Sequence, residues 1–480
     1  MNANTVGMAI ILLGLGLLAG KYIRMKVSFF ARLFLPSSIL GGFVLLLLSQ
    51  EGLGRLFGLF ERTESWRYGL FTADLVNVWI RLPGLLISFI FASLFLGKKI
   101  PNLKTIWLTA GPQVAYGQSV AWGQYVVGIG LTLLILTPFF GANPLSGALI
   151  EIAFEGGHGT AAGLRQTFID LDFQEGADLA MGLATVGVVS GVVLGVLLIN
   201  WGVRQGKTNY LKTPSRIDER DLRGIVDEES RPSSGTMTTQ PSSIEPLALH
   251  IGFVLLSVFI GWLFQQGLIV LENATWGASG ERLVIAYVPL FPLAMIGGVL
   301  VQLALDRFDN DNVVDRETIN RLQGLALDFL IVSALATLSL SVLGENWVIF
   351  VTLALGGMVW NIVMFVFLAR RMIPKNWFER GIGDFGQSMG MTAAGLMLIR
   401  IVDSQGDTQA LEAFGYKQLL FEPFVGGGLM TALSVPLMFQ FGALPIFIFT
   451  FSVMLVWLGV GIFYFGRQSA DEPNETVRTD

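Results

Sequence analysis

Two glycine-rich stretches carry ionisable side chains that could bind a small solute. The first is Glu155-Gly156-Gly157-His158-Gly159-Thr160, and the second is Gly381-Ile382-Gly383-Asp384-Phe385-Gly386-Gln387-Ser388. Glycines let the backbone approach a ligand closely and adopt positive φ angles. Both stretches interrupt long apolar segments, where ionisable groups are costly and usually functional. The sequence therefore predicts two breaks in the backbone, here called the first and second tips, that bind a ligand.

The chemistry expected at these tips is that of helix ends. We expect one half-helix to begin at Thr160 and another to run through Thr392. Unpaired N–H groups at such a start favour a carboxylate or another anion, whereas exposed carbonyl groups suit Na⁺. The residues expected to bind the substrate are Gly156, Gly157, His158, Gly159, Thr160, Gly386, Gln387, Ser388 and Thr392.

Carboxylates and amides near the tips are candidates for coupling to an ion. Glu155 and Asp384 could neutralise Na⁺ or take up a proton, and Glu151 lies one helical turn before Glu155. Gln124 and Asn361 occupy matching apolar segments and could line the path, with interhelical hydrogen bonding as the alternative. The sequence indicates no Na⁺ ligands beyond these candidates, no other metal and no organic cofactor.

Histidine and cysteine limit the possible chemistry. The chain has no cysteine and two histidines, so thiolate chemistry and a histidine-rich metal site are excluded. His158 could donate to a substrate carboxylate or brace the first tip, and His250 is expected at a helix boundary. An intramembrane enzyme is therefore the least supported class, and no nucleic-acid partner is indicated.

Composition identifies the elements that must position these residues. The chain has 480 residues, of which 53% are hydrophobic and 14% are charged, as expected for a polytopic membrane protein. A membrane-spanning helix needs about 20 apolar residues. We expect no removable signal peptide at the N-terminus. Eleven segments approach that length, beginning near residues 5, 33, 75, 105, 178, 247, 288, 322, 347, 418 and 445.

Repeated motifs indicate that the chain is duplicated. Residues 160–164 recur unchanged as 392–396, and the pattern P-x4-G-G occurs at 36–42 and at 292–298, in the same order. We expect an all-α membrane protein with two inverted repeats of five transmembrane helices, each with a re-entrant or broken segment, and an extra C-terminal helix. The predicted units are a first repeat 1–203, a linker 204–246, a second repeat 247–441, a helix 442–467 and a tail 468–480.

The topology depends on the two broken segments, 145–172 and 380–402. If each enters and leaves by one face, the first half crosses five times and the two tips can meet; full crossings would instead place the linker outside. Most Lys and Arg residues lie on the inner side if the N-terminus is outside. We therefore expect a cytoplasmic, flexible linker and a cytoplasmic tail.

These motifs resemble the glutamate:sodium symporter family. The resemblance rests on Gly-Gly-His-Gly-Thr at 156–160, supported by P-x4-G-G at 36–42 and by Arg371-Met372 with Lys375-Asn376. It implies a Na⁺-coupled importer of L-glutamate or a related anionic amino acid in a bacterial plasma membrane, as a homodimer with an elevator-type movement. Glu155 and Asp384 depart from the family pattern. The alternatives are a cation/proton-coupled antiporter or carboxylate exporter that uses these two carboxylates, or a channel.

Overall fold

The fold is built from long apolar helices. The computed structural model describes residues 2–32, 35–56, 68–98, 103–208, 225–226, 231–277, 284–390, 392–403 and 408–467, and every regular element in them is helical. Within these ranges, ten helical segments are long and apolar enough to cross a membrane. Five precede the linker and five follow it. The predicted class, an all-α polytopic membrane protein, is confirmed.

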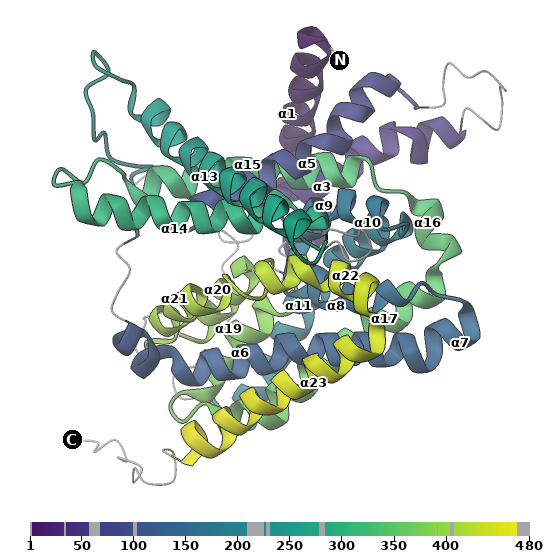
Figure 1. Cartoon of the computed structure of the whole chain (residues 1–480), viewed down its shortest axis with the longest axis vertical. Helices are drawn as coiled ribbons and strands as arrows, with labels where there is room; N and C mark the ends of the chain where they lie inside the picture. Colours follow the sequence, from purple (N-terminus) through teal and green to yellow (C-terminus); the bar gives the residue numbers. More distant parts are fainter. Residues whose placement is uncertain are drawn as a thin grey trace.

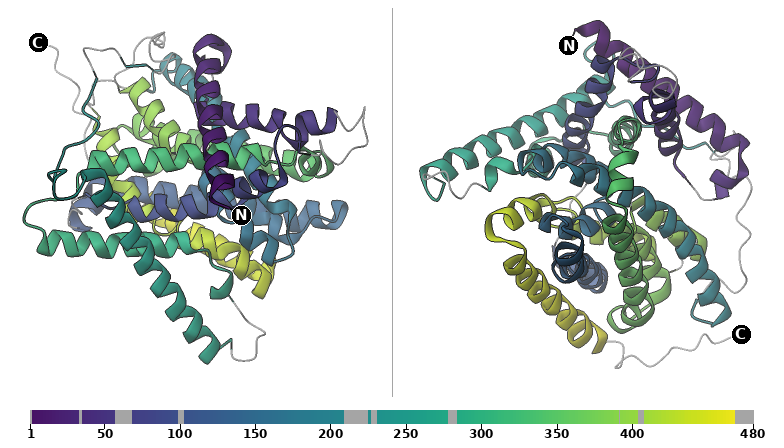
Figure 2. Two further views of the ribbon diagram at one scale, coloured as in Figure 1. Left: turned by 90° about the horizontal axis from the view of Figure 1, so that it is seen from above. Right: turned by 90° about the vertical axis from the view of Figure 1, so that its right-hand side faces the viewer.

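Six long helices form the upper group in Figure 1. α1 packs on α3, α13 packs on α14, and α15 lies against both α3 and α5. In the right panel of Figure 2, this group covers one side of the remaining helices. Its elements are α1 (Ala3–Lys26), α3 (Ser37–Leu48), α5 (Ala73–Ser93), α13 (Pro246–Ala274), α14 (Leu290–Phe308) and α15 (Arg316–Ala336), with the short α2 (Ser28–Arg32), η1 (Gln50–Gly54) and η6 (Ile285–Tyr287).

The two P-x4-G-G motifs make corresponding contacts in this group. The first glycine, Gly41 or Gly297, lies against the preceding helix, where an added Cβ would come within 2.5 or 2.1 Å of a backbone oxygen. The second glycine packs on a further helix. An added Cβ on Gly42 would lie 2.6 Å from Leu335 in α15, and one on Gly298 would lie 2.2 Å from Ala92 in α5. Small residues thus let these helices pack closely.

The remaining helices form the lower group. α6 runs antiparallel to α17, since Gly123 lies against Trp360 while Gly356 lies against Leu131. α16 (Leu340–Glu345) connects the two groups before α17. The elements of the lower group are α6 (Leu103–Leu131), η3 (Thr132–Leu136), α7 (Thr137–Phe140), η4 (Pro144–Ala148), α8 (Leu149–Phe154), α9 (Gly157–Gly163), α10 (Arg165–Asp170), α11 (Glu175–Arg204), α17 (Trp347–Val363), η7 (Met364–Ala369), α18 (Arg370–Met372), α19 (Trp377–Gln387), α20 (Thr392–Val402), α21 (Ala410–Phe421), α22 (Leu429–Phe441), α23 (Ala443–Gly459) and η8 (Val460–Phe465).

The segment from η4 to α10 enters and leaves the lower group at one end. At its start, Gly147 lies against Ile129 near the end of α6. After it, α11 begins beside the start of α17, where Gly182 lies against Phe350. Because α17 is antiparallel to α6, the start of α17 and the end of α6 lie at the same end of the bundle. The segment therefore turns back inside the protein.

The segment formed by α19 and α20 turns back from the opposite end. The Asn376 side chain donates to the Thr408 carbonyl at 3.3 Å, which brings the two ends of the segment together. Arg380 in α19 donates to the carbonyl of Thr109 at 3.4 Å, near the start of α6. The two turned-back segments thus enter from opposite ends of α6.

One predicted span has a different form. The sequence predicts a continuous crossing that begins near residue 418, but α21 ends at Phe421 and α22 begins only at Leu429. Pro423 lacks a backbone N–H, and Gly426 and Gly427 have φ angles of +71° and +99°. Hydropathy alone does not register this break, because the segment stays apolar on both sides. The ten long segments include Ala443–Phe465 as the last.

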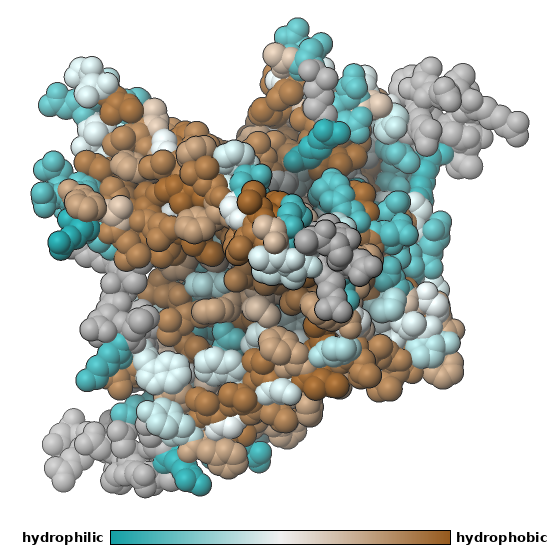
Figure 3. Space-filling model, viewed as in Figure 1, coloured by the Kyte–Doolittle hydropathy of each residue, from teal (hydrophilic) through white to brown (hydrophobic). Residues whose placement is uncertain are grey.

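Apolar side chains also cover the outer surface. Leu255, Phe259 and Leu263 on α13 are exposed, and Figure 3 shows a wide hydrophobic area where α13 and α14 lie. Lipid is the environment in which such a surface is stable.

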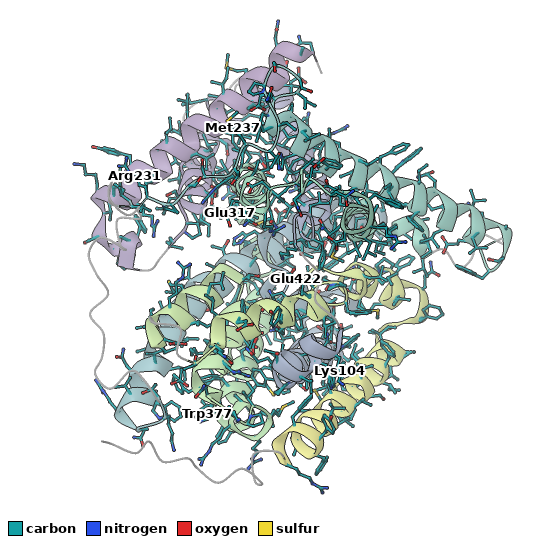
Figure 4. The ribbon with its side chains drawn as sticks, turned by 90° about the vertical axis from the view of Figure 1, so that its left-hand side faces the viewer. Lys104, Arg231, Met237, Glu317, Trp377 and Glu422 are labelled. Atoms are coloured by element: carbon teal, nitrogen blue, oxygen red, sulfur yellow. The ribbon has the colours of Figure 1, made fainter. Side chains whose placement is uncertain are left out.

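The described end of the linker, residues 231–245, is held against the upper group. Thr236 N donates to Asp315 at 3.2 Å and the Thr238 hydroxyl donates to the Val313 carbonyl at 2.7 Å. His250, at the start of α13, accepts from Asp315 N at 2.7 Å. Figure 4 shows Arg231 and Met237 along the upper helices. Residues 209–224 and 227–230 of the predicted flexible linker and the whole tail 468–480 lie outside the described residues.

Candidate functional site

Three breaks in helices meet inside the lower group. The first separates α8 from α9, the second separates α19 from α20, and the third separates α21 from α22. Gly157 at the first break has a φ of +70°, and a Cβ there would lie 2.5 Å from the carbonyl oxygen of Gly390 at the second. A Cβ on Gly427 at the third break would lie 2.6 Å from the Thr160 hydroxyl. Glycine is what allows these backbones to touch.

Glu151 holds the first and third breaks together. One oxygen of its buried carboxylate accepts from the backbone N–H of Gly426 at 2.9 Å and from the Thr431 hydroxyl at 2.8 Å. The other accepts from the Tyr125 hydroxyl at 2.5 Å. Both oxygens are thus occupied by protein donors, which suits a structural role.

Gln124 and Asn361 hold the second break. Their side-chain amides donate to the same oxygen, the Ser388 carbonyl, at 2.8 and 2.9 Å. They also hydrogen-bond to each other at 3.2 Å across α6 and α17. Of the two readings of these residues, the interhelical hydrogen bond is present in the structure.

Asp384 is paired with a lysine. Lys417 in α21 places its ammonium 3.1 Å from Asp384 Oδ1, and both side chains are fully buried. The ammonium also donates to Gln387 Oε1 at 2.9 Å and lies 3.8 Å from the centre of the Phe421 ring. Gln113 donates to the other Asp384 oxygen at 3.3 Å. The carboxylate charge is therefore compensated by a residue of the chain itself.

Glu155 has no ion-pair partner at contact distance among the described residues, although the nearby Lys417 charge also acts on it. Only 4% of the residue is exposed, yet neither carboxylate oxygen has a hydrogen-bond partner among the described residues. The Ser388 hydroxyl is close enough to stabilise the negative charge of the Glu155 carboxylate. The buried hydroxyl oxygens of Ser388 and Thr160 likewise have no partner in the described part of the chain. Buried oxygen atoms are normally hydrogen-bonded, so a ligand that binds these oxygens would stabilise them.

His158 lies beside Glu155 and is almost completely buried. Its Nε2 is 3.0 Å from the Thr185 hydroxyl, which itself donates to the Met181 carbonyl at 3.0 Å. Thr185 therefore accepts from Nε2, and this bond braces the ring against α11. The ring still faces the cavity described next.

A cavity of about 490 Å³ lies at the boundary of the upper and lower groups. Glu155 lines it from the lower group, and Lys98 and Arg316 line it from the upper group, with Glu422 beside them. Figure 4 shows Glu422 between the two groups. Arg316 is held by the carbonyls of Ser93 and Leu96 at 3.1 and 2.7 Å. Lys98 and Arg316 thus bring positive charge to a cavity that also holds the carboxylates of Glu155 and Glu422.

The structure separates the predicted site residues into two sets. The cavity is lined by Glu155, Gly156, Gly157, His158, Gly159, Gln387 and Thr392. The predicted residues that do not line it are Thr160, Gly386, Ser388, Asp384, Gln124 and Asn361. Sequence reasoning missed Lys98, Arg316, Lys417 and Glu422. A charged residue in an apolar segment was the available signal for Lys417.

Two expected features of the tips were wrong. The half-helix at the first tip begins at Gly157 rather than at Thr160. The stretch from Gly381 to Gln387 is helical and belongs to α19, so that the second break begins at Ser388. Packing explains the helical glycines, because a Cβ on Gly386 would lie 2.8 Å from Gly395 in α20. Here glycine permits close contact between two helices.

In the described part of the chain, no group of three or more His, Cys, Asp or Glu side chains could hold a metal ion. Curated protein sequences gave no match to this chain. The sodium/glutamate symporter family matches residues 2–405, which include the first two breaks and precede the third. This match covers most of the chain, which therefore belongs to the sodium/glutamate symporter family.

Proposed function

We propose that this protein carries L-glutamate, or a related anionic amino acid, into the cell together with Na⁺. The observation that carries the proposal is the Glu155 carboxylate, which is buried beside the cavity with both oxygens unused among the described residues. An unpaired buried carboxylate is strongly disfavoured, so a cation that arrives with the substrate stabilises it.

The groups around Glu155 suit Na⁺. Hard cations prefer oxygen ligands, and the Glu155 carboxylate lies near the Ser388 hydroxyl. Discontinuous helices in transporters offer such oxygens near the middle of the membrane. Na⁺ at this position would neutralise the charge that otherwise repels an anionic substrate.

The cavity suits a small anionic amino acid. Its volume of about 490 Å³ falls in the range of small-molecule sites, roughly 300–1,000 Å³. Lys98 and Arg316 attract carboxylates at one side, while Gln387 and Gln418 offer amide groups. The pairing of Asp384 with Lys417 removes Asp384 as a free proton carrier, which favours symport over a proton relay through both tip carboxylates.

The arrangement of the two groups supports an elevator-type movement. The site breaks lie in the lower group, and the cavity lies where α9 meets α5 and α15 of the upper group. The corresponding contacts of the two glycine motifs support inverted repeats. We place the N-terminus outside and the linker and tail in the cytoplasm of a bacterial cell, with the homodimer as a further part of the proposal.

Uptake by purified protein in liposomes tests the proposal. Labelled L-glutamate should accumulate against its gradient when Na⁺ is directed inward, and K⁺ in place of Na⁺ should abolish accumulation. Glu155→Gln should lower Na⁺-dependent uptake at least about tenfold, since about 1.4 kcal/mol of stabilisation corresponds to that factor. The matched control is Glu345→Gln at the exposed end of α16, which should transport normally. Accumulation without Na⁺, or full activity of the Glu155 variant, would refute the coupling.

A further inference from the structure

Lys417 occupies a position built for a cation. Its side chain is fully buried, and its ammonium contacts Asp384, Gln387 and the face of the Phe421 ring. α6 makes room for it at Gly117, where a Cβ would lie 2.5 Å from Lys417 Cε. A charged ammonium is stable in such surroundings only when it is paired and hydrogen-bonded.

Each oxygen of Asp384 already lies next to a polar group of the chain. One oxygen of Asp384 faces Lys417 at 3.1 Å, and the other accepts from Gln113 at 3.3 Å. Gln387 Oε1, which could also ligate a cation, is taken by Lys417 at 2.9 Å. A mobile ion could reach Asp384 only by displacing a cation that is tethered to α21.

The two tip carboxylates therefore differ in kind. Asp384 at the second tip is paired directly with Lys417, whereas Glu155 at the first tip has no ion pair among the described residues and interacts with the Lys417 charge only at longer range. Glu151, a third carboxylate near the tips, is satisfied by Tyr125, Thr431 and Gly426.

We propose that Lys417 is a built-in cation that takes the place of a coupling ion at the second tip, so that each chain binds one Na⁺, at Glu155. This inference rests on the proposed function and specifies its ion stoichiometry. Lys417 lies beyond residues 2–405, the range matched by the family. It acts as a determinant of coupling and does not itself contact the substrate cavity.

The direct test is the number of Na⁺ ions bound by the purified full-length chain, measured with radioactive Na⁺ at equilibrium without substrate. The wild type should bind about one Na⁺ per chain with a Hill coefficient near one. Lys417→Met frees Asp384 and should raise the number to about two. The double variant Lys417→Met/Asp384→Asn should return it to about one, because both charges are gone. Lys26→Met, at the exposed end of α1, is the control and should behave as the wild type.

The outcomes distinguish this inference from the proposed function. Two Na⁺ ions on the wild type would overturn the role of Lys417 and leave Na⁺ coupling intact. No Na⁺ on the wild type would sink Na⁺ coupling itself. Size-exclusion chromatography shows whether Lys417→Met is folded. If it is not, the number of Na⁺ ions bound by the wild type and by the double variant tests the inference. A double variant that binds no Na⁺ would place the ion at Asp384 and overturn the inference.

Discussion

Three buried carboxylates near the tips show how the surroundings of a residue set its role. Glu151 is saturated by hydrogen-bond donors, Asp384 is paired with Lys417, and Glu155 has neither kind of partner in the described residues. All three side chains are buried, so the carboxylate without a direct ion pair is the one that gains most from a bound cation. This argument ranks Glu155 first among the coupling candidates.

Lys98 gives the site a dependence on pH. Burial and the charge of Arg316 lower the pKa of Lys98 from 10.5 to about 8, against the opposing effect of Glu422. A lysine is charged below its pKa, so Lys98 attracts a carboxylate below pH 8 and loses this attraction as the pH rises through that value. The KM for glutamate should therefore rise several-fold between pH 7 and pH 9.

This dependence is measured as uptake kinetics with equal pH on both sides of the liposome membrane. Lys98→Arg keeps the charge over the whole range and should flatten the change in KM. Lys98→Met should show the high KM at every pH. A wild-type KM that stays constant from pH 7 to pH 9 would contradict a role for the Lys98 charge in substrate binding.

Part of the site can be predicted from the sequence and part cannot, for a physical reason. Glu155 and His158 lie close together in the chain, with two glycines between them, so local composition identifies them. Lys98, Arg316 and Glu422 reach the cavity from three distant segments. Only tertiary packing brings these three together, and no pattern of spacing in a single sequence encodes it.

At the scale of elements, ten of the predicted long helices are present, but the positions of the breaks between helices differ from those predicted. Apolar length identified ten of the spans, because the membrane imposes that length. The break after Phe421 and the helical course of Gly381 were not predicted. Glycine serves both open turns and close helix packing, and the sequence alone does not distinguish these two uses.

Gly157 offers a test of the contact between the first two breaks. Gly157→Ala introduces a Cβ at a φ of +70° and within 2.5 Å of the Gly390 carbonyl oxygen. The backbone strain alone should cost about 1–3 kcal/mol, and the tips must separate. We expect a lower melting temperature and at least about a tenfold loss of uptake. Gly267→Ala on α13, where no atom lies within 4 Å, is the control. An unchanged Gly157 variant would show that the tips need not touch.

At the scale of the whole molecule, the boundary between the two groups is the surface that must shift during transport. A Cβ on Gly163 in α9 would lie 3.1 Å from Ile87 Cγ2 and 3.2 Å from Ile87 Cγ1 in α5. Cysteines at these two positions should therefore fall within the range of disulfide geometry. The chain has no native cysteine, so an introduced pair is the sole thiol pair present.

The double variant Ile87→Cys/Gly163→Cys should transport when reduced and stop when oxidised, because the disulfide joins the lower group to the upper group. A second pair, Gly16→Cys/Leu45→Cys, lies within the upper group, where a Cβ on Gly16 would be 3.1 Å from Leu45 Cγ. Its oxidation should leave uptake unchanged, since α1 and α3 move together. After the chain is cleaved by a protease between the two cysteines, the fragments stay together on a non-reducing gel only if the disulfide has formed. Uptake before and after reduction then shows the effect of the disulfide on transport. If the oxidised pair between the groups still transports at full rate, the two groups do not move past each other at α5 and α9, and substrate must cross by a local opening of the tips.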